Sequence, residues 1–211
     1  MGRLPHWGKT GRIGLRGGLP VWLLAGVCLL AAPVQAGPTG EPEPELRARL
    51  VQALQDRDGF DDPRTADVWF ADMSERMRRY NPKAMPDPQQ RLQFLRLVHG
   101  EATHAHLQPG LVLSVINVES AFDRLAISRS GAFGYMQIMP FWLNESEVGH
   151  NGDNLFNTKT NLRMGCTILR YYLEVEHDNY KRALERYNGS YGRANYPYLV
   201  LNLYNRRWYP L

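Results

Sequence analysis

The hydrophobic positions of this chain follow the three- to four-residue spacing of amphipathic helices. An acidic N-cap residue followed by proline marks two helix starts, at Asp62-Pro63 and at Asp87-Pro88. Residues 81–88 contain three prolines and end the first of these helices. Helices are predicted over about residues 45–56, 63–80, 88–102, 109–119, 159–176, 180–187 and 197–206.

The most apolar of these helices, over residues 111–119, is expected at the centre of the fold. Residues 120–158 are rich in Ser, Gly and Asn and show no long periodic segment, so a loop-rich region follows it. No run alternates well enough to predict a substantial strand. The sequence therefore predicts a mainly α fold in which a buried helix leads into a long irregular segment.

Residues 1–36 have the three parts of a secretory signal peptide. A basic stretch covers residues 1–16, an apolar run covers residues 19–32, and a Val-Gln-Ala cleavage signal stands at residues 34–36. The apolar run is shorter than the ~20 residues that span a bilayer as a helix. We expect cleavage after Ala36 and export, with an uncleaved membrane anchor as the alternative.

The net charge of the chain comes from this leader. Of 25 Lys and Arg residues, four lie in residues 1–36, which hold none of the 21 Asp and Glu residues, so the remainder is formally neutral. This distribution argues against a nucleic-acid-binding protein. The hydrophobic content of 44% also excludes a disordered chain.

Three segments are expected: the leader, a tether with a helical N-terminal extension over residues 37–86, and a main domain over residues 87–211.

After cleavage one cysteine remains, Cys166, in an apolar helical stretch. We expect a buried and unreactive thiol there.

Glu119 is the candidate catalytic residue because it ends the most hydrophobic helix. Val115, Ile116 and Val118 precede it, so its carboxyl is expected to face a dry surface. Desolvation and the negative end of the helix dipole both raise the pKa of such a group. A carboxylic acid that protonates a leaving group needs this property. The alternative is an ordinary helix-terminal Glu turned toward solvent.

Five short motifs follow one another between residues 111 and 191. They are Glu119-Ser120, Ser128, the run Gly-Ala-Phe-Gly-Tyr-Met-Gln over residues 131–137, Asn161-x-x-x-Gly165 and Tyr187-Asn188-Gly189-Ser190. In this order they resemble the soluble lytic transglycosylase family, whose catalytic domains share the goose-type lysozyme fold. Each motif is weak alone, but five in order over about 80 residues make a strong signal. The resemblance implies a lysozyme-like α+β domain with a loop-rich substrate groove.

Three positions depart from the family pattern. Tyr135 stands where Leu is usual and adds a hydroxyl, and Arg186 precedes Tyr187 where a small residue is usual. Gly189-Ser190 replaces Ala-Gly. None of these changes removes the catalytic acid, but all bear on which sugar the site prefers.

The resemblance implies that Glu119 acts as the single acid and base. It also implies that the substrate is bound by Ser128, Tyr135, Met136, Gln137 and Tyr187. A turn role for Ser128, a core role for Tyr187 and simple packing for Met136 are the alternatives. Either sugar stacking or core packing suits the aromatic residues Phe141, Trp142 and Tyr191.

Most glycosidases use two carboxylates, yet Asp123, Glu145 and Glu147 stand in no recognised second-carboxylate pattern. One acid suits a substrate-assisted route, in which the N-acetyl oxygen of the sugar is the nucleophile. The resemblance thus implies cleavage of the β-1,4 bond between N-acetylmuramic acid and N-acetylglucosamine in peptidoglycan, leaving 1,6-anhydro-muramyl ends. A hydrolytic lysozyme or chitinase on the same fold, and a non-catalytic glycan-binding wall module, are the alternatives.

The implied partners are peptidoglycan glycan strands in the bacterial periplasm. Membrane association is expected only if the leader is not cleaved, and no nucleic acid or cofactor is expected. His99, His104 and His106 invite a metal site, but positions 104 and 106 of a helix point about 200° apart. We therefore expect no metal.

Overall fold

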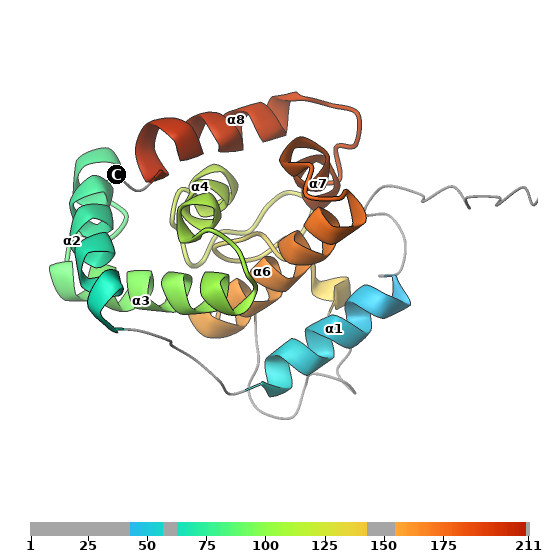
Figure 1. Cartoon of the computed structure of the whole chain (residues 1–211), viewed down its shortest axis with the longest axis horizontal. Coiled ribbons are helices and arrows are strands. Elements are labelled where there is room, and N and C mark those ends of the chain that lie inside the picture. Colours follow the sequence, from blue (N-terminus) through green and yellow to red (C-terminus); the bar gives the residue numbers. More distant parts are fainter. Residues whose placement is uncertain (1–42, 57–62, 143–154, 210–211) are drawn as a thin grey trace, which may run out of the picture. The chain divides into compact units, whose positions relative to one another are not determined.

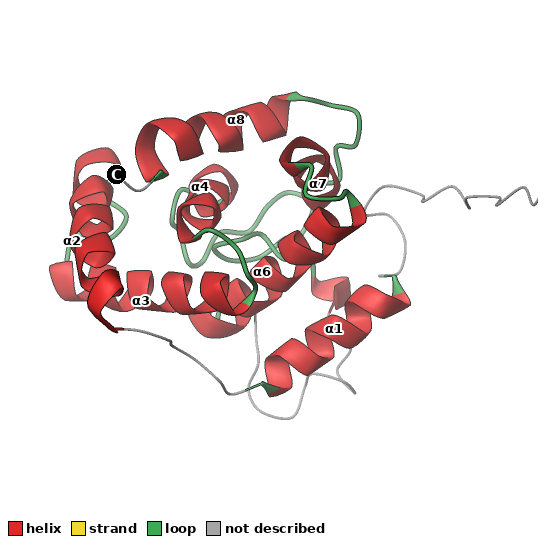
Figure 2. Ribbon diagram, in the orientation of Figure 1, coloured by secondary structure: helices red, strands yellow, loops and turns green. Residues whose placement is uncertain are grey.

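Helices make up nearly all the regular structure of the computed structural model, which describes residues 43–56, 63–142 and 155–209. Within these ranges Figure 2 shows helices and loops and no strand. The predicted mainly α fold is confirmed. The predicted leader, most of the tether and the candidate N-cap Asp62 lie outside the described residues. No helix in these ranges is long and apolar enough to cross a membrane.

The helices begin and end close to the predicted positions. They are α1 (Pro44–Gln55), α2 (Pro63–Tyr80), α3 (Pro88–His104), α4 (Pro109–Glu119), α6 (Thr158–Val175), α7 (Tyr180–Tyr187) and α8 (Asn195–Leu203). A 3-10 turn, η1 (Pro140–Trp142), lies in the irregular segment, and a π-helical turn, η2 (Tyr204–Trp208), follows α8. The last helix starts two residues earlier than expected and changes to π geometry where a continuous α-helix was predicted.

Side chains at the starts of three helices supply hydrogen-bond acceptors for backbone amides that have no partner within the helix. These caps are Asp87, which accepts from Gln89 N at 3.0 Å, Asn157 from Thr160 N at 3.1 Å and Asn179 from Arg182 N at 3.2 Å. Of these three caps, Asp87 was identified from the sequence, because a proline follows it.

Helix α4 lies at the centre of the fold, between α3 and α8 (Figure 1). Residues 110–116 are all buried, as the apolar run predicted. The C-terminal turn η2 closes on the start of this helix, since a Cβ at Gly110 would lie 2.2 Å from Trp208 O. The indole of Trp208 donates to Asn117 Oδ1 at 3.3 Å. These contacts hold the helix that carries Glu119.

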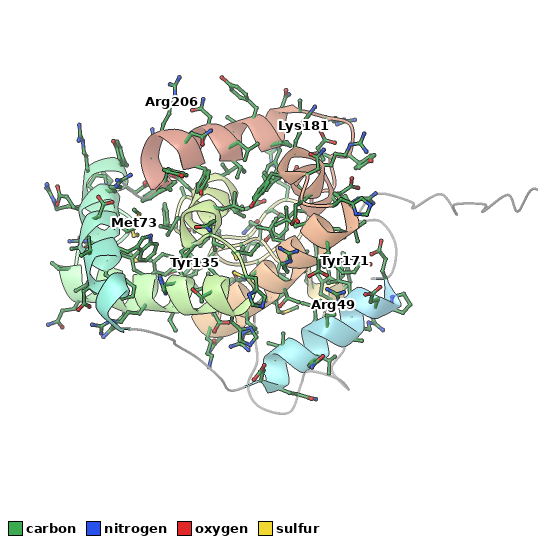
Figure 3. The ribbon with its side chains drawn as sticks, in the orientation of Figure 1. Arg49, Met73, Tyr135, Tyr171, Lys181 and Arg206 are labelled. Carbon is green, nitrogen blue, oxygen red and sulfur yellow. The ribbon has the colours of Figure 1, made fainter. Side chains whose placement is uncertain are left out.

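Helices on both sides of residue 87 contribute to a single hydrophobic core. Leu46 and Leu50 of α1 and Met73 and Met77 of α2 are almost wholly buried in it. Helix α1 packs on α6, where Figure 3 shows Arg49 beside Tyr171 and the guanidinium lies 5.3 Å from the ring centroid.

A buried ion pair joins three helices near this contact. Arg163 of α6 pairs with Glu101 of α3, and both side chains are almost inaccessible. The same guanidinium donates from Nη1 to Ala53 O at 2.6 Å and to Asp56 O at 3.1 Å, at the end of α1. Because Arg163 satisfies acceptors from two other elements, it fixes the position of α6. Cys166, one turn later on α6, is buried as predicted, and burial raises the pKa of its thiol.

Candidate active site

Glu119 faces a cavity of about 310 Å³, where the end of α4 meets α6, α7 and the loop that follows Glu119. Burial raises the pKa of this carboxyl from 4.5 to about 7. Hydrogen bonds from Tyr196 and Asn188 act in the opposite direction. The predicted elevation of the Glu119 pKa is therefore confirmed, with desolvation as its main cause.

Tyr196, on α8, is hydrogen-bonded directly to this carboxyl. Its hydroxyl donates to Glu119 Oε1 at 2.5 Å across 77 positions of sequence. Burial, and then the charge of Glu119, raise the pKa of Tyr196 well above 10, so the hydroxyl keeps its proton at neutral pH. Sequence reasoning missed this residue. The only feature in the sequence that could have indicated Tyr196 is its position, as an aromatic residue with a hydroxyl, at the start of an apolar helix.

Ser120 ties the end of α4 to the loop that lines the cavity. Its hydroxyl lies 2.8 Å from Tyr135 O and 3.2 Å from Ile116 O. The serine of the Glu119-Ser120 motif therefore positions backbone and does not line the cavity.

Ser128 lines the cavity and also shapes a tight turn. Its hydroxyl oxygen accepts from Ala132 N at 2.9 Å, and its backbone amide donates to Ala132 O at 2.9 Å. Gly131 closes this turn at φ +80°, a conformation that L side chains rarely adopt. The hydroxyl proton of Ser128 remains available to a ligand, so the turn role and the predicted substrate role are compatible.

The loop from Phe133 to Met136 is held by Asn161 of α6. The Asn161 side chain accepts from Met136 N at 2.8 Å and donates to Phe133 O and Leu155 O, each at 2.9 Å. A Cβ at Gly134, which has φ +74°, would lie 2.5 Å from Asn161 Nδ2. The asparagine of the Asn-x-x-x-Gly motif therefore has a structural role, because it holds this loop by hydrogen bonds.

The glycine of that motif makes room for Met136. A Cβ at Gly165 would lie 2.4 Å from Met136 Sδ and 2.8 Å from Met136 Cβ. Met136 is fully buried, and its carbonyl accepts from the hydroxyl of Tyr187 at 2.8 Å. Met136 thus supports the wall of the cavity from behind, and its side chain does not line it.

Three of the five predicted substrate residues line the Glu119 cavity, namely Ser128, Gln137 and Tyr187. Gln137 donates from Nε2 to Gly134 O at 2.9 Å, and its carbonyl oxygen stays available as an acceptor. The hydroxyl of Tyr187 donates its proton to Met136 O, so toward a ligand this hydroxyl can act only as a hydrogen-bond acceptor.

Tyr135 is turned to a different cavity. That cavity measures about 590 Å³ and is lined by parts of α3 and by the residues directly after Ser120. The Tyr135 ring packs on Phe94, with centroids 4.8 Å apart, and burial raises its pKa to about 12. The hydroxyl that replaces the usual Leu is therefore not at the Glu119 cavity.

The aromatic candidates separate in the same way. Trp142 lines the cavity and packs on Phe141, with centroids 5.1 Å apart. Tyr191 is exposed, and its ring lies over the guanidinium of Arg186 at 4.7 Å. Arg186 itself lines the cavity. Sequence reasoning noted its departure from the family pattern but gave it no role.

Among the described residues that line this cavity, Glu119 is the only carboxylate. Asp123 caps a turn by accepting from Leu125 N at 2.8 Å and lines the other cavity. Glu145 and Glu147 lie outside the described residues. The arrangement offers one buried acid, hydroxyl and amide groups around it, and an aromatic wall, which suits acid–base chemistry on a polar ligand.

The histidines lie apart from this site. His99 packs against the rings of Trp69 and Phe70, with centroids 5.1 and 5.5 Å away, and burial lowers its pKa. His104 Nε2 lies 3.0 Å from Asp56 Oδ2. Within the described ranges no three His, Cys, Asp or Glu side chains are grouped to hold a metal ion.

Residues 96–197 match the family described as the transglycosylase SLT domain. Three similar curated proteins, each named membrane-bound lytic murein transglycosylase C, come from Actinobacillus pleuropneumoniae serotypes 5b, 3 and 7. Each is 30% identical over 95 residues, which cover 42% of this chain and 25% of the relative. The matched part therefore spans a quarter of the length of these relatives.

A similar solved structure is that of an inactive mutant of the lytic transglycosylase Slt from Pseudomonas aeruginosa. It has 19% sequence identity and a TM-score of 0.41, over 75% of this chain and 32% of that one. The matched range 96–197 includes Glu119, the loop held by Asn161, and both Tyr187 and Tyr196. Residues 96–197 are therefore similar to the transglycosylase SLT domain family, and the described part of this range is mainly helical.

Proposed function

We propose that this protein is a peptidoglycan lytic transglycosylase. It cleaves the β-1,4 bond between N-acetylmuramic acid and N-acetylglucosamine and leaves a 1,6-anhydro-muramyl end. One observation carries the proposal: Glu119 is the only carboxylate among the described residues of its cavity, and its pKa is raised to about 7. The family match and the names of the relatives support the substrate class.

In the first step the protonated Glu119 carboxyl gives its proton to the glycosidic oxygen, and the bond from C1 of the muramic residue to that oxygen breaks. The N-acetyl oxygen of the same sugar attacks C1 and holds it as a cyclic intermediate. A carboxyl with a pKa of about 7 is protonated in most molecules below neutral pH, so it is ready for this step.

In the second step the Glu119 carboxylate takes the proton of the C6 hydroxyl. The C6 oxygen then attacks C1, the N-acetyl oxygen leaves, and the anhydro ring closes without water. The hydrogen bonds from Tyr196 and Asn188 stabilise the carboxylate that exists between the two steps. One carboxyl thus serves as acid and then as base, which fits a cavity with a single acid among its described residues.

Mass spectrometry of digested cell-wall glycan tests this proposal. Anhydro ends are one water lighter than reducing ends, so a lytic transglycosylase and a hydrolytic lysozyme or chitinase give different product masses. Glu119→Gln should lower the rate by at least ~10²-fold, because an amide cannot carry the proton. Glu174→Gln, on the surface of α6, is the matched control and should keep full activity.

Reducing ends from the wild-type chain would overturn the transglycosylase route in favour of hydrolysis. A wild-type chain that binds the glycan without cleaving it would indicate a non-catalytic wall module.

We also infer that the protein is exported to the periplasm and that its leader is removed after Ala36, on the basis of the three-part pattern in residues 1–36. N-terminal sequencing of the protein from a periplasmic extract should begin at Gly37. Recovery of an intact chain from the inner membrane would contradict this and support a membrane anchor.

A further inference from the structure

A nearly buried arginine lines the cavity of Glu119. Arg186, on α7, has 7% of its side chain exposed, and its Nε donates to the buried carboxylate of Glu176. The ring of Tyr191 covers the guanidinium at 4.7 Å. One edge and one face of the guanidinium are therefore fixed by the protein.

The other edge of this guanidinium makes no hydrogen bond to any residue that the structure describes. Within the described residues, the hydrogen bond of Arg186 uses Nε alone, and Nη1 and Nη2 donate none. Because arginine carries five N–H donors in a planar fork, most of its donors remain unused. Leaving a charged donor group unsatisfied inside a cavity costs free energy unless water or a ligand supplies acceptors. A ligand that brings a carboxylate would match this edge in both charge and geometry.

We propose that Arg186 binds the free lactyl carboxylate of an N-acetylmuramic residue, and that the enzyme prefers glycan strands stripped of their peptides. This rests on the proposed function. The lactyl ether of muramic acid ends in a carboxyl group, which is an anion when free and a neutral amide when a peptide is attached. Of the two forms, only the anion offers two equivalent acceptors to the Nη edge of Arg186.

The size of the cavity favours the same form of the substrate. Its volume of about 310 Å³ is at the lower end of the ~300–1,000 Å³ found for small-molecule sites. It therefore suits a sugar with a short acidic substituent better than a sugar that carries a peptide. A reaction that hydrolyses the lactyl amide must then act before this enzyme.

Arg186 should act on substrate choice and not on the protonation of Glu119. The groups that shift the Glu119 pKa are the surrounding buried atoms, Tyr196 and Asn188. Removal of Arg186 should therefore change the preference between substrates while the alkaline limb of the pH profile stays in place. A purely structural residue would change neither.

The test compares kcat/KM of the full chain on three substrates. These are peptide-free strands with free lactyl carboxylates, the same strands after conversion of those carboxylates to methylamides, and strands that keep their peptides. The wild type should prefer the free carboxylates over the methylamides by at least about tenfold, as expected for a charge-assisted hydrogen bond. In Arg186→Met this ratio should fall to about one, within the ~threefold scatter of such comparisons.

Arg182→Met is the matched control. It removes the same charge from the same helix, 3.9 Å from the same Glu176, but its side chain is 60% exposed and does not line the cavity. It should keep the wild-type preference. Should Arg186→Met fail to fold because Glu176 is left buried alone, the double variant Arg186→Met with Glu176→Gln removes both charges and is measured instead.

The possible results separate the two proposals. An unchanged preference in a folded Arg186 variant, or a wild type that cleaves the free-carboxylate and methylamide strands equally well, overturns the Arg186 assignment and leaves the proposed function intact. Faster cleavage of peptide-bearing strands would place the recognised carboxylate on the peptide and also overturn it. A wild type that cleaves none of the three overturns the proposed function itself.

Discussion

The protonation of Glu119 is set by two opposing influences from residues that are distant in sequence. Burial raises its pKa, and donors from Tyr196 and Asn188 lower it again, so that it ends at about 7. A group that must be an acid in one step and a base in the next works best with a pKa near the working pH. The sequence indicated the burial because the neighbours of Glu119 on α4 are apolar. The donors could not be predicted, because they lie 69 and 77 positions away.

Removal of the Tyr196 hydroxyl tests this balance. In Tyr196→Phe the carboxylate of Glu119 loses a donor, so its pKa should rise by about one unit, and the alkaline limb of the activity profile should move to higher pH. Tyr198→Phe, on the same helix but with 67% of its surface exposed, is the control and should not move the limb. An unshifted limb in a folded Tyr196→Phe protein would mean that Glu119 is not the titrating acid.

The raised pKa also has a consequence for stability. Between pH 4.5 and about 7 the folded chain keeps the Glu119 proton and the unfolded chain releases it. Stability therefore falls as the pH rises through this window, by roughly 3 kcal/mol in total. Glu119→Gln lacks this titration, so it should melt above the wild type at pH 8 and close to it at pH 4. Calorimetry at the two pH values measures the difference, and an equal offset at both would contradict the desolvation of Glu119.

At the scale of elements, the helices were predictable and the loop that shapes the site was not. Proline and N-cap signals such as Asp87-Pro88 act within one turn of helix, so they can be read locally. The loop over residues 120–138 depends on Asn161, whose partner Met136 is 25 positions away. Its conformation also needs positive φ at Gln137 as well as at its glycines. Tyr135 shows the limit of the motif, since Ala132 and Gln137 of the same run line one cavity and the Tyr135 side chain faces another.

Asn161→Ala should damage the loop and the activity together. The change removes three hydrogen bonds and leaves the buried amide of Met136 without its acceptor, at a cost of about 2–4 kcal/mol. Because Gln137 and Ser128 depend on this loop, the activity of the remaining folded protein should also fall. Asn179→Ala, which removes an exposed N-cap at α7, is the control for loss of a single asparagine and should lower stability without this loss of activity. Full activity in folded Asn161→Ala would show that the loop holds its shape by other contacts.

At the scale of the whole molecule, the family match and the hydrophobic core have different extents. The match begins at residue 96, within α3, but the core also includes side chains from α1 and α2. The sequence marked residues 37–86 as a separate extension because of the prolines at 81–88. That pattern reports where a helix stops, and it carries no information about which helices share a core.

We therefore expect α1 to be needed for stability and not for chemistry. Deletion of residues 37–56 removes Leu46 and Leu50 from the core, at about 1.5–3 kcal/mol each. It also takes two carbonyl acceptors from the buried Arg163, so the total loss is a large share of the ~5–15 kcal/mol that stabilises a typical domain. A milder change tests the same contribution. The double variant Leu46→Ala with Leu50→Ala should also lower the melting temperature, and Gln52→Ala on the exposed face should not. Since α1 does not line the Glu119 cavity, the fraction that folds should keep its kcat and its pH profile. If the truncated and full chains have the same melting temperature, α1 is an appendage. If the truncated chain stays folded but has a lower kcat, α1 acts on the site.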